Sequence, residues 1–307
     1  MERGSVLVVM LCALLANGIV RDCVASYIGE GKNWTILSPL DIDRPQKSSL
    51  SGESASVQAA KDSMSDWQWQ YASHTWNTGL GGSYYGAEVT SDVYGFGLRL
   101  TQASGSVIAI HSTTGGQTTG IIVGWHVFPS LYQDSNTHFF TYWISGGSHC
   151  FNTLCFPGFI RTTGSNIAPG DIIYPSSKIA GRVQYISLRV FKDSASGNWN
   201  VHCGFNGPAQ SVGYFPKDVI ASLSSSTQLN ITFGGFIGYN DNDSNVPMGN
   251  GNVPPNNAAN MGHLQLVDIK GGNHVIDEDL PFMSDKCYQV SPIVKGQFSY
   301  GGPNNCA

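Results

Sequence analysis

Short segments in which apolar and polar residues alternate recur along the chain from about residue 81 onward. Among them are "GLRLTQA" at 97–103, "GSVIAIHS" at 105–112, "GIIVGWHVF" at 120–128, "FFTYWI" at 139–144, "VQYISLRVFKD" at 183–193, "NWNVHCGF" at 198–205, "QLNITFGGFIGY" at 228–239 and "GHLQLVDIK" at 262–270. Turn residues separate them, and only "FPKDVIASL" at 215–223 has the pattern of a helix. This spacing predicts an all-β fold, an antiparallel β-sandwich or barrel.

The first 80 residues have a different pattern. Arg3 precedes the apolar run "SVLVVMLCALLANGIV", and "CVA" at 23–25 places small residues where signal peptidase requires them. We predict a signal peptide over 1–25, although cleavage after Gly18 is an alternative. After it we predict a polar linker or pro-segment over 26–80 and a single domain over 81–307. No later run is long and apolar enough to cross a membrane, so we expect a secreted protein, extracellular (apoplast or wall) or vacuolar.

Charge is sparse in this sequence. Charged residues make up 12% and the net charge is −5, against about 25% charged residues in an average globular domain. A mildly acidic chain is a poor partner for nucleic acid or an anionic membrane, so we expect neither. Three sequons, at Asn33, Asn230 and Asn242, are candidates for glycosylation during export.

Five cysteines remain after the predicted cleavage, enough for two disulfides and one thiol. They are Cys150, Cys155, Cys203, Cys287 and Cys306. Export favours disulfides, and nearest neighbours suggest Cys150–Cys155 and Cys287–Cys306, although spacing does not fix the pairing. Cys203 would then be a buried thiol. A zinc site that adds His149 and His202 lacks the ligand spacing of a finger or ribbon, so we expect no metal and no cofactor.

A succession of motifs covers residues 80–306. They are "YYGAEV" at 84–89, "GWHVFPSLYQD" at 124–134, "FFTYW" at 139–143, "CFNTLCFPGF" at 150–159, "GDIIYPSSKIAGRVQYISLRVFKDSASGNW" at 170–199, "VGYFP" at 212–216, "FGG" at 233–235, "PMGNG" at 247–251, and "CY" with a closing "YGGPNNC" within 287–306. In order and spacing this succession resembles the neprosin family of secreted plant proteins.

The resemblance implies a sandwich of two antiparallel sheets and the same two disulfides. It also implies a glutamic peptidase that cuts after proline at acid pH, with one glutamate on each of two facing strands in a groove. An ionised carboxylate would activate water while a protonated one assists the leaving group. The groove residues that the resemblance points to are Gly124, Trp125, His126, Gly234, Gly235 and the residue at position 236.

Both glutamate positions hold hydrocarbon side chains in this chain. The residue two before Gly124 is Ile122, and the residue after the paired glycines is Phe236. The positions of the glutamates in the chain support this alignment with the family motifs. Only Glu88 and Glu278 occur within the predicted domain, and neither adjoins these motifs. We therefore expect a pseudoenzyme that keeps its groove for proline-containing peptides.

Two alternatives remain open at this stage. The first is an active prolyl endopeptidase-like hydrolase that uses other groove residues, for example His126 with Asp134, although Asp134 also suits a structural turn. The second is a cell-wall or glycan-binding module that uses exposed aromatic residues. Its candidates are Trp125, Tyr142, Trp143, Tyr185 and Trp199, which are more often core residues. Oligomeric state is not predicted.

Overall fold

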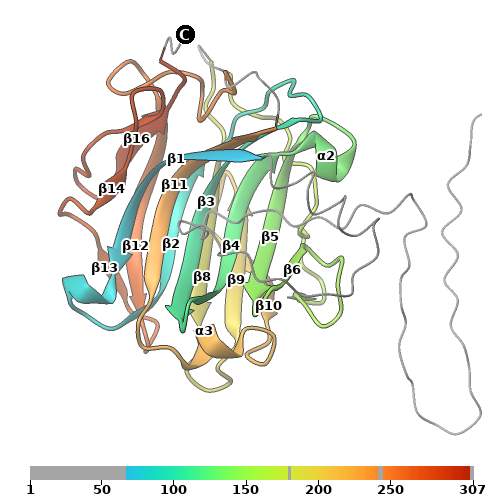
Figure 1. Cartoon of the computed structure of the whole chain (residues 1–307), viewed down its shortest axis with the longest axis vertical. Helices are drawn as coiled ribbons and strands as arrows, with labels where there is room; N and C mark the ends of the chain where they lie inside the picture. The colour runs from blue at the N-terminus through green and yellow to red at the C-terminus, as the bar shows by residue number, and fades with distance from the viewer. Residues whose placement is uncertain (1–66, 179–180, 241–244, 305–307) are drawn as a thin grey trace, which may run out of the picture.

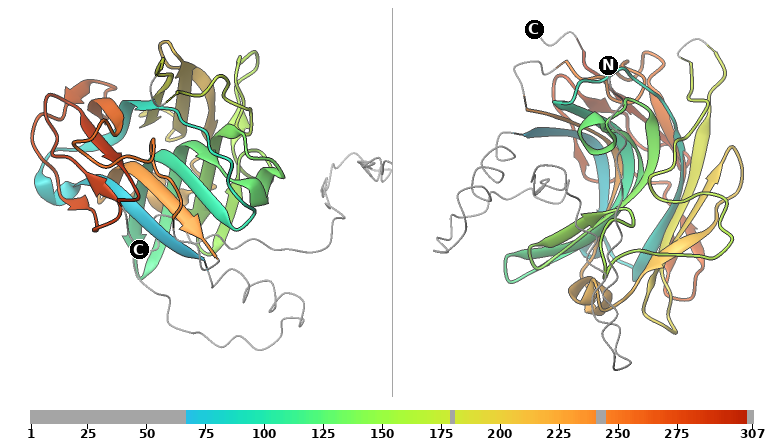
Figure 2. Two further views of the ribbon diagram at one scale, coloured as in Figure 1. Left: turned by 90° about the horizontal axis from the view of Figure 1, so that it is seen from above. Right: turned by 90° about the vertical axis from the view of Figure 1, so that its right-hand side faces the viewer.

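Two antiparallel sheets packed face to face form the molecule (Figures 1 and 2), as the alternation predicts. The structure is a computed structural model that describes residues 67–178, 181–240 and 245–304. In Figure 1 the labels of the two sheets alternate across the view, because one layer lies over the other. The described residues contain no helix long and apolar enough to span a bilayer.

The first sheet has seven strands. In spatial order they are β14 (Phe282–Met283), β1 (Gln68–Asn77), β11 (Asn230–Tyr239), β3 (Gln102–Thr114), β4 (Gln117–Val127), β5 (Thr137–Ser145) and β6 (Ser148–Phe151). Register along its centre is regular, since β11, β3, β4 and β5 pair without a shift over their common length. This regularity fixes which side chains share a face.

The second sheet has nine strands. Eight follow the order β15 (Gln289–Val290), β16 (Phe298–Gly301), β12 (Ala259–Asp268), β2 (Tyr84–Asp92), β8 (Tyr185–Lys192), β9 (Trp199–Phe205), β10 (Gln210–Phe215) and β7 (Ile160–Arg161), and β13 (Asn273–Val275) pairs with β12. The main core lies between the two sheets, where Trp125, Trp199 and Phe233 are fully buried.

The predicted domain boundary at residue 80 is wrong. Residues 68–77 form β1, which pairs over its whole length with β11 in the first sheet. Ala72 and Trp76 of this strand are buried in the main core, so the strand belongs to the folded domain. The predicted signal peptide, most of the predicted linker, and the candidates Asn33, Asn242 and Cys306 lie outside the described residues.

Helices are few and short. The predicted helix at 215–223 is reduced to α3 (Ala221–Ser225), and α2 (Pro129–Tyr132) occurs where the sequence pattern predicts none. A 3-10 turn, η1 (Thr78–Leu80), follows β1. A single turn carries too few residues to show a helical period, which explains why α2 is not visible in the sequence.

Candidate functional site

One face of the seven-stranded sheet points away from the nine-stranded sheet, and we call it the aromatic face. A hydrophobic cluster separate from the main core covers its centre: Val107, Ala109, Ile122, Phe140, Tyr142 and Phe236. Trp69, Tyr71, Ile144 and Phe151 pack against this cluster and are partly buried. The alternation of each strand sends these side chains to one side and the core residues to the other.

Cross-strand register brings the two expected glutamate positions onto this face. Gly124 pairs with Val107, which pairs with Gly234, so these three form one row across the sheet. Ile122 lies two residues from that row along β4, and Phe236 lies two residues from it along β11, on the opposite side of the row. Ile122 pairs with Ala109 and Phe236 pairs with Gly105, so the two positions share the face but lie two strands and four residues of β3 apart.

Ile122 and Phe236 are both buried, with exposed fractions of 2% and 5%. The Phe236 ring lies over Gly105, where an added Cβ would be 2.7 Å from ring atom Cε1. The same ring lies 6.0 Å from the ring centroid of Trp69 and 6.5 Å from that of Phe140. Position 236 is thus part of a packed aromatic cluster.

The paired glycines have structural roles. Gly234 has φ of +154°, and an added Cβ would lie 2.3 Å from the carbonyl oxygen of Ala72 on β1. Gly235 faces the opposite side, where an added Cβ would be 2.6 Å from the Tyr300 ring. Close approach of the neighbouring strand and of a core ring therefore requires both glycines.

Two of the six predicted groove residues do not lie on the aromatic face. Trp125 is fully buried in the main core, and its Nε1 donates to Ser91 Oγ at 3.3 Å. Gly235 also faces that core, against Tyr300. Since neighbours along a strand point to opposite faces, only Gly124, His126, Gly234 and Phe236 share the face with Ile122.

Comparison with known proteins identifies the family. A model of the Neprosin family matches residues 100–303, about two thirds of the chain. The chain belongs to the neprosin family. The matched range carries both of the positions, 122 and 236, where the resemblance expects a glutamate.

Solved structures of glutamic peptidases are similar to this neprosin chain. Scytalido-glutamic peptidase in complex with a peptide-based transition state analogue has a TM-score of 0.39 and 10% identity, covering 77% of this chain and 98% of that chain. SCP-B, an eqolisin-family peptidase in complex with the tripeptide Ala-Ile-His, has a TM-score of 0.38 and 10% identity over the same shares.

No described strand of the sheet that carries positions 122 and 236 contains a carboxylate. Glu88 lies on β2 of the other sheet, where its Oε2 accepts from Arg189 Nη1 at 2.6 Å. Glu278 lies in a loop between β13 and β14. Neither remaining glutamate of the domain lies on a strand of this sheet.

His126 is held neutral beside the cluster. Asn152 Nδ2 donates to Tyr132 Oη at 3.1 Å, and the same hydroxyl is hydrogen-bonded to His126 Nε2 at 2.9 Å. The His126 ring also stacks on Phe140, with 3.8 Å between centroids. Burial, with His138 nearby, lowers the pKa of His126 well below its ordinary value. Its Nε2 is already engaged by Tyr132 Oη.

The pairing of His126 with Asp134 suggested by the sequence does not occur. Asp134 Oδ1 instead accepts from His138 Nε2 at 3.0 Å and from the backbone N of Asn136 at 2.8 Å. Burial raises the pKa of Asp134, but the hydrogen bonds from His138 and Asn136 outweigh it and lower that pKa overall. The bond to Asn136 closes a turn, which is the structural role that the motif suggested.

His138 has oxygen acceptors at both ring nitrogens. Nδ1 lies 2.7 Å from the carbonyl oxygen of Gly170, while Nε2 lies 3.0 Å from Asp134 Oδ1. The sequence analysis missed His138, Tyr132 and Asn152. Two of the three lie within quoted motifs, but their mutual contacts arise only when β4, β5 and α2 come together.

The cysteines behave largely as predicted. Cys150 and Cys155 form a disulfide with Cα atoms 6.1 Å apart. This bond removes both sulfurs from the zinc set considered for the sequence. Cys287 is disulfide-bonded as well, although its expected partner Cys306 lies outside the described residues. Cys203 is free and buried, and burial raises its pKa to about 12; it is therefore an inert thiol.

The exposed aromatic strip proposed for a glycan-binding module does not exist at the predicted residues. Trp125 and Trp199 are 0% exposed, and Tyr142 and Trp143 are also buried. Only Tyr185, at 37%, reaches the surface appreciably. Packing within the molecule accounts for these rings.

Proposed function

We propose that this neprosin-family protein is exported and has no glutamic peptidase activity. One observation carries the proposal: two buried hydrocarbon side chains, Ile122 and Phe236, stand where the family resemblance leads us to expect glutamates, on a sheet whose described strands hold no carboxylate. A hydrocarbon can neither take a proton from water nor donate one to a leaving amine. Burying apolar groups there also avoids the desolvation cost of two carboxyls.

The neutral His126 offers no replacement. To act as a general base through Nε2, it would have to give up its hydrogen bond with Tyr132 Oη. Its lowered pKa makes it a weak proton acceptor. His138 is engaged by Asp134 and Gly170 at both nitrogens. These contacts disfavour the alternative of a hydrolase that works through other residues of the same face.

A proline-containing peptide is the ligand that we propose for the aromatic face. Trp69, Tyr71 and Phe151 border the buried cluster and are only partly buried, so a peptide would contact this rim rather than Ile122. Extended proline-rich segments commonly dock in grooves lined by aromatic side chains. They also lose little conformational entropy on binding, because their extended helix is already formed.

Export is supported by the predicted signal segment together with the cysteine chemistry. The Cys150–Cys155 bond and the bonded state of Cys287 suit an oxidising compartment. Sequencing the N-terminus of the protein recovered from culture medium would test this part of the proposal. A product that is retained in cells with residues 1–25 intact would contradict it.

Peptidase activity can be tested with a fluorogenic proline-containing peptide from acid to neutral pH. We expect the wild type to be silent, and an Ile122→Glu/Phe236→Glu double variant to gain cleavage if the rest of the site is intact. Robust cleavage by the wild type would overturn the proposal. The Phe156→Ala variant, which removes a ring that is 95% exposed, serves as a matched surface control.

Binding needs its own experiment, because a silent enzyme need not bind peptide. We would titrate a proline-rich peptide, and the same peptide with alanine at every proline, into wild type, Trp69→Ala and Phe156→Ala. Proline-dependent binding that weakens only in Trp69→Ala is the expected result. Equal binding of the two peptides would refute recognition of proline on this face.

A further inference from the structure

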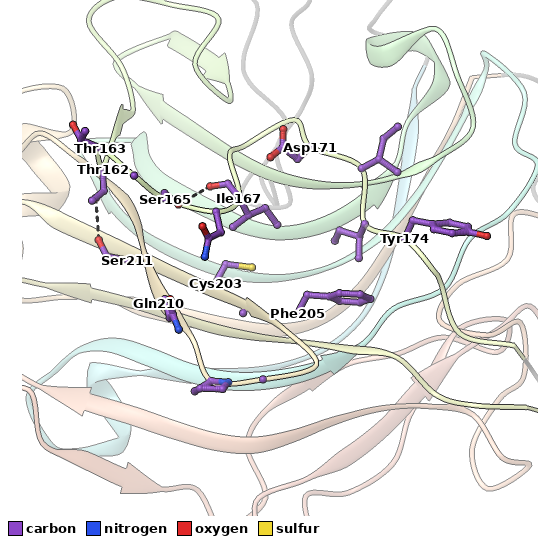
Figure 3. A pocket seen from close by; sticks show the side chains of 17 residues that line it. Thr162, Thr163, Ser165, Ile167, Asp171, Tyr174, Cys203, Phe205, Gln210 and Ser211 are labelled. Atoms are coloured by element: carbon purple, nitrogen blue, oxygen red, sulfur yellow. Dashed lines mark hydrogen bonds between the residues drawn. The ribbon is translucent and has the colours of Figure 1, made fainter.

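A pocket on the nine-stranded sheet lies away from the aromatic face. Its volume is about 640 Å³, within the range of small-molecule sites. The segment 162–174 forms one wall, and residues 203–211 of β9, β10 and their connection form the other. Figure 3 shows Cys203 and Phe205 on the strand side, Thr162 and Ser211 toward one end, and Tyr174 at the other. It shares no residue with the hydrophobic cluster that contains Ile122 and Phe236.

The lining mixes polar and apolar residues and is almost uncharged. Its hydroxyl- and amide-bearing side chains, apart from the Tyr174 phenol, are Thr162, Thr163, Ser165, Asn166, Gln210 and Ser211. Among the lining residues, all of which belong to the part of the chain that the structure describes, Asp171 is the only charged one. A lone carboxylate disfavours phosphates, uronic acids and other anions. The pocket is therefore suited to a neutral ligand rich in hydrogen-bonding groups.

Several of these polar groups have unused bonding capacity. Thr162 Oγ1 is engaged by Ser211 Oγ at 2.9 Å, and Ser165 Oγ donates to the carbonyl of Ile167 at 2.7 Å. Asp171 uses Oδ2 to accept from the backbone N of Ala168 at 2.7 Å. In the part of the chain that the structure describes, Asp171 Oδ1 and the amides of Asn166 and Gln210 make no hydrogen bond.

Exposed apolar surface adjoins the polar wall. Tyr174 is 82% exposed and Ile172 is 52% exposed, and both line the pocket. A sugar ring presents hydroxyls at its edge and C–H groups on its faces. Amides and a carboxylate match the hydroxyls, while a tyrosine ring can pack against the C–H face.

We propose that this pocket binds a neutral saccharide. Asn166, Gln210 and Asp171 Oδ1 hydrogen-bond to its hydroxyls, and Tyr174 packs against a ring face. The inference stands independently of peptide binding on the aromatic face, since the two sites share no residue. It also differs from the aromatic strip considered for the sequence, because its residues are mostly non-aromatic and come from the segment 162–174 and from β9, β10 and their connection.

Isothermal titration with soluble oligosaccharides tests the proposal on the full secreted chain. The probes are cellohexaose, xylohexaose and mannohexaose, with hexagalacturonic acid as the anionic counterpart. We expect at least one neutral probe to bind and the anionic probe not to bind. Absence of binding by all three neutral probes at millimolar concentration overturns the proposal, as does a preference for hexagalacturonic acid.

Variants locate the binding. Tyr174→Ala and Asn166→Ala alter exposed side chains, so both are expected to keep the wild-type Tm while weakening the neutral probe about three- to tenfold, as the loss of one contact predicts. Phe156→Ala, at an exposed ring outside the pocket, should bind like the wild type. Unchanged affinity in both pocket variants would place the saccharide elsewhere and refute the assignment.

Discussion

Replacing Ile122 by glutamate tests whether the buried cluster on the aromatic face tolerates a charge. Ile122 is 2% exposed and packs within a cluster that includes Val107, Ala109 and Tyr142. A carboxylate there loses its hydration without gaining a positive partner, which raises its pKa by several units. For a shift of about three units, the pKa of the new glutamate moves from about 4.3 to about 7.3, equivalent to about 4 kcal/mol.

The sign of this effect determines the experiment. Because the folded-state pKa is raised, the carboxyl part of the destabilisation is absent below about pH 4.3 and complete above about pH 7.3. Lost packing of the isoleucine adds a cost that does not change with pH. The difference in the free energy of unfolding between wild type and variant should therefore grow by about 4 kcal/mol from pH 4 to pH 8.

Urea unfolding of the wild type, Ile122→Glu and Val294→Glu at several pH values measures this difference. Val294 is 58% exposed, so its glutamate should leave the pH profile close to that of the wild type. A difference for Ile122→Glu that is constant between pH 4 and pH 8 would mean that the carboxylate stays hydrated. Position 122 would then be open to water, as an active groove requires, and the closed cluster would be refuted.

Three further predictions concern stability. Burial lowers the pKa of His111 to about 4, so the free energy of unfolding of the wild type should fall by about 3 kcal/mol as pH drops from about 6.5 to about 4. In urea titrations, His111→Gln should reduce this loss of stability at acid pH. An unchanged pH dependence in the variant would contradict the prediction. Asp92, which accepts from the backbone N of Asn260 at 2.9 Å, has its pKa raised to about 6, chiefly by burial. The ionised Asp92 side chain therefore destabilises the fold increasingly as pH rises from about 3.8 to about 6. Asp92→Asn should raise the free energy of unfolding by up to about 3 kcal/mol at pH 7 and not at all at pH 3.5. An equal gain at both pH values would mean that the effect comes from packing. The Cys150→Ser/Cys155→Ser variant should lose about 2 kcal/mol, since the bond closes a loop with a sequence separation of only 5, and a loss of more than about 4 kcal/mol would reveal a role beyond chain entropy.

Strand alternation predicts the centre of the fold well because its period is local. Residues 105–112 and 120–128 extend as β3 and β4 nearly where the pattern places them. The segment 68–77 gives a weaker signal, since glutamine, serine and histidine occupy four of its ten positions. Its burial depends on β11, which lies more than 150 residues later in the chain, and no local pattern contains that information.

The site was predictable in identity but only partly in geometry. Motif spacing finds Ile122 and Phe236, and strand parity alone would have assigned Trp125 to the face opposite His126. The Tyr132–His126 and Asp134–His138 bonds need the turn through α2, whose φ of +62° at Gln133 reverses the chain toward β5. Such contacts depend on backbone direction rather than on residue type.

The position of β1 has a consequence for how the domain can be divided. The family match begins at residue 100, after both β1 and β2. A fragment cut at that point would remove the partner of β11 and leave β2's neighbours, β8 and β12, unpaired on one side. Three open edges in two sheets invite intermolecular strand addition. Such a fragment should aggregate, and the smallest soluble unit of this protein should begin no later than Trp67.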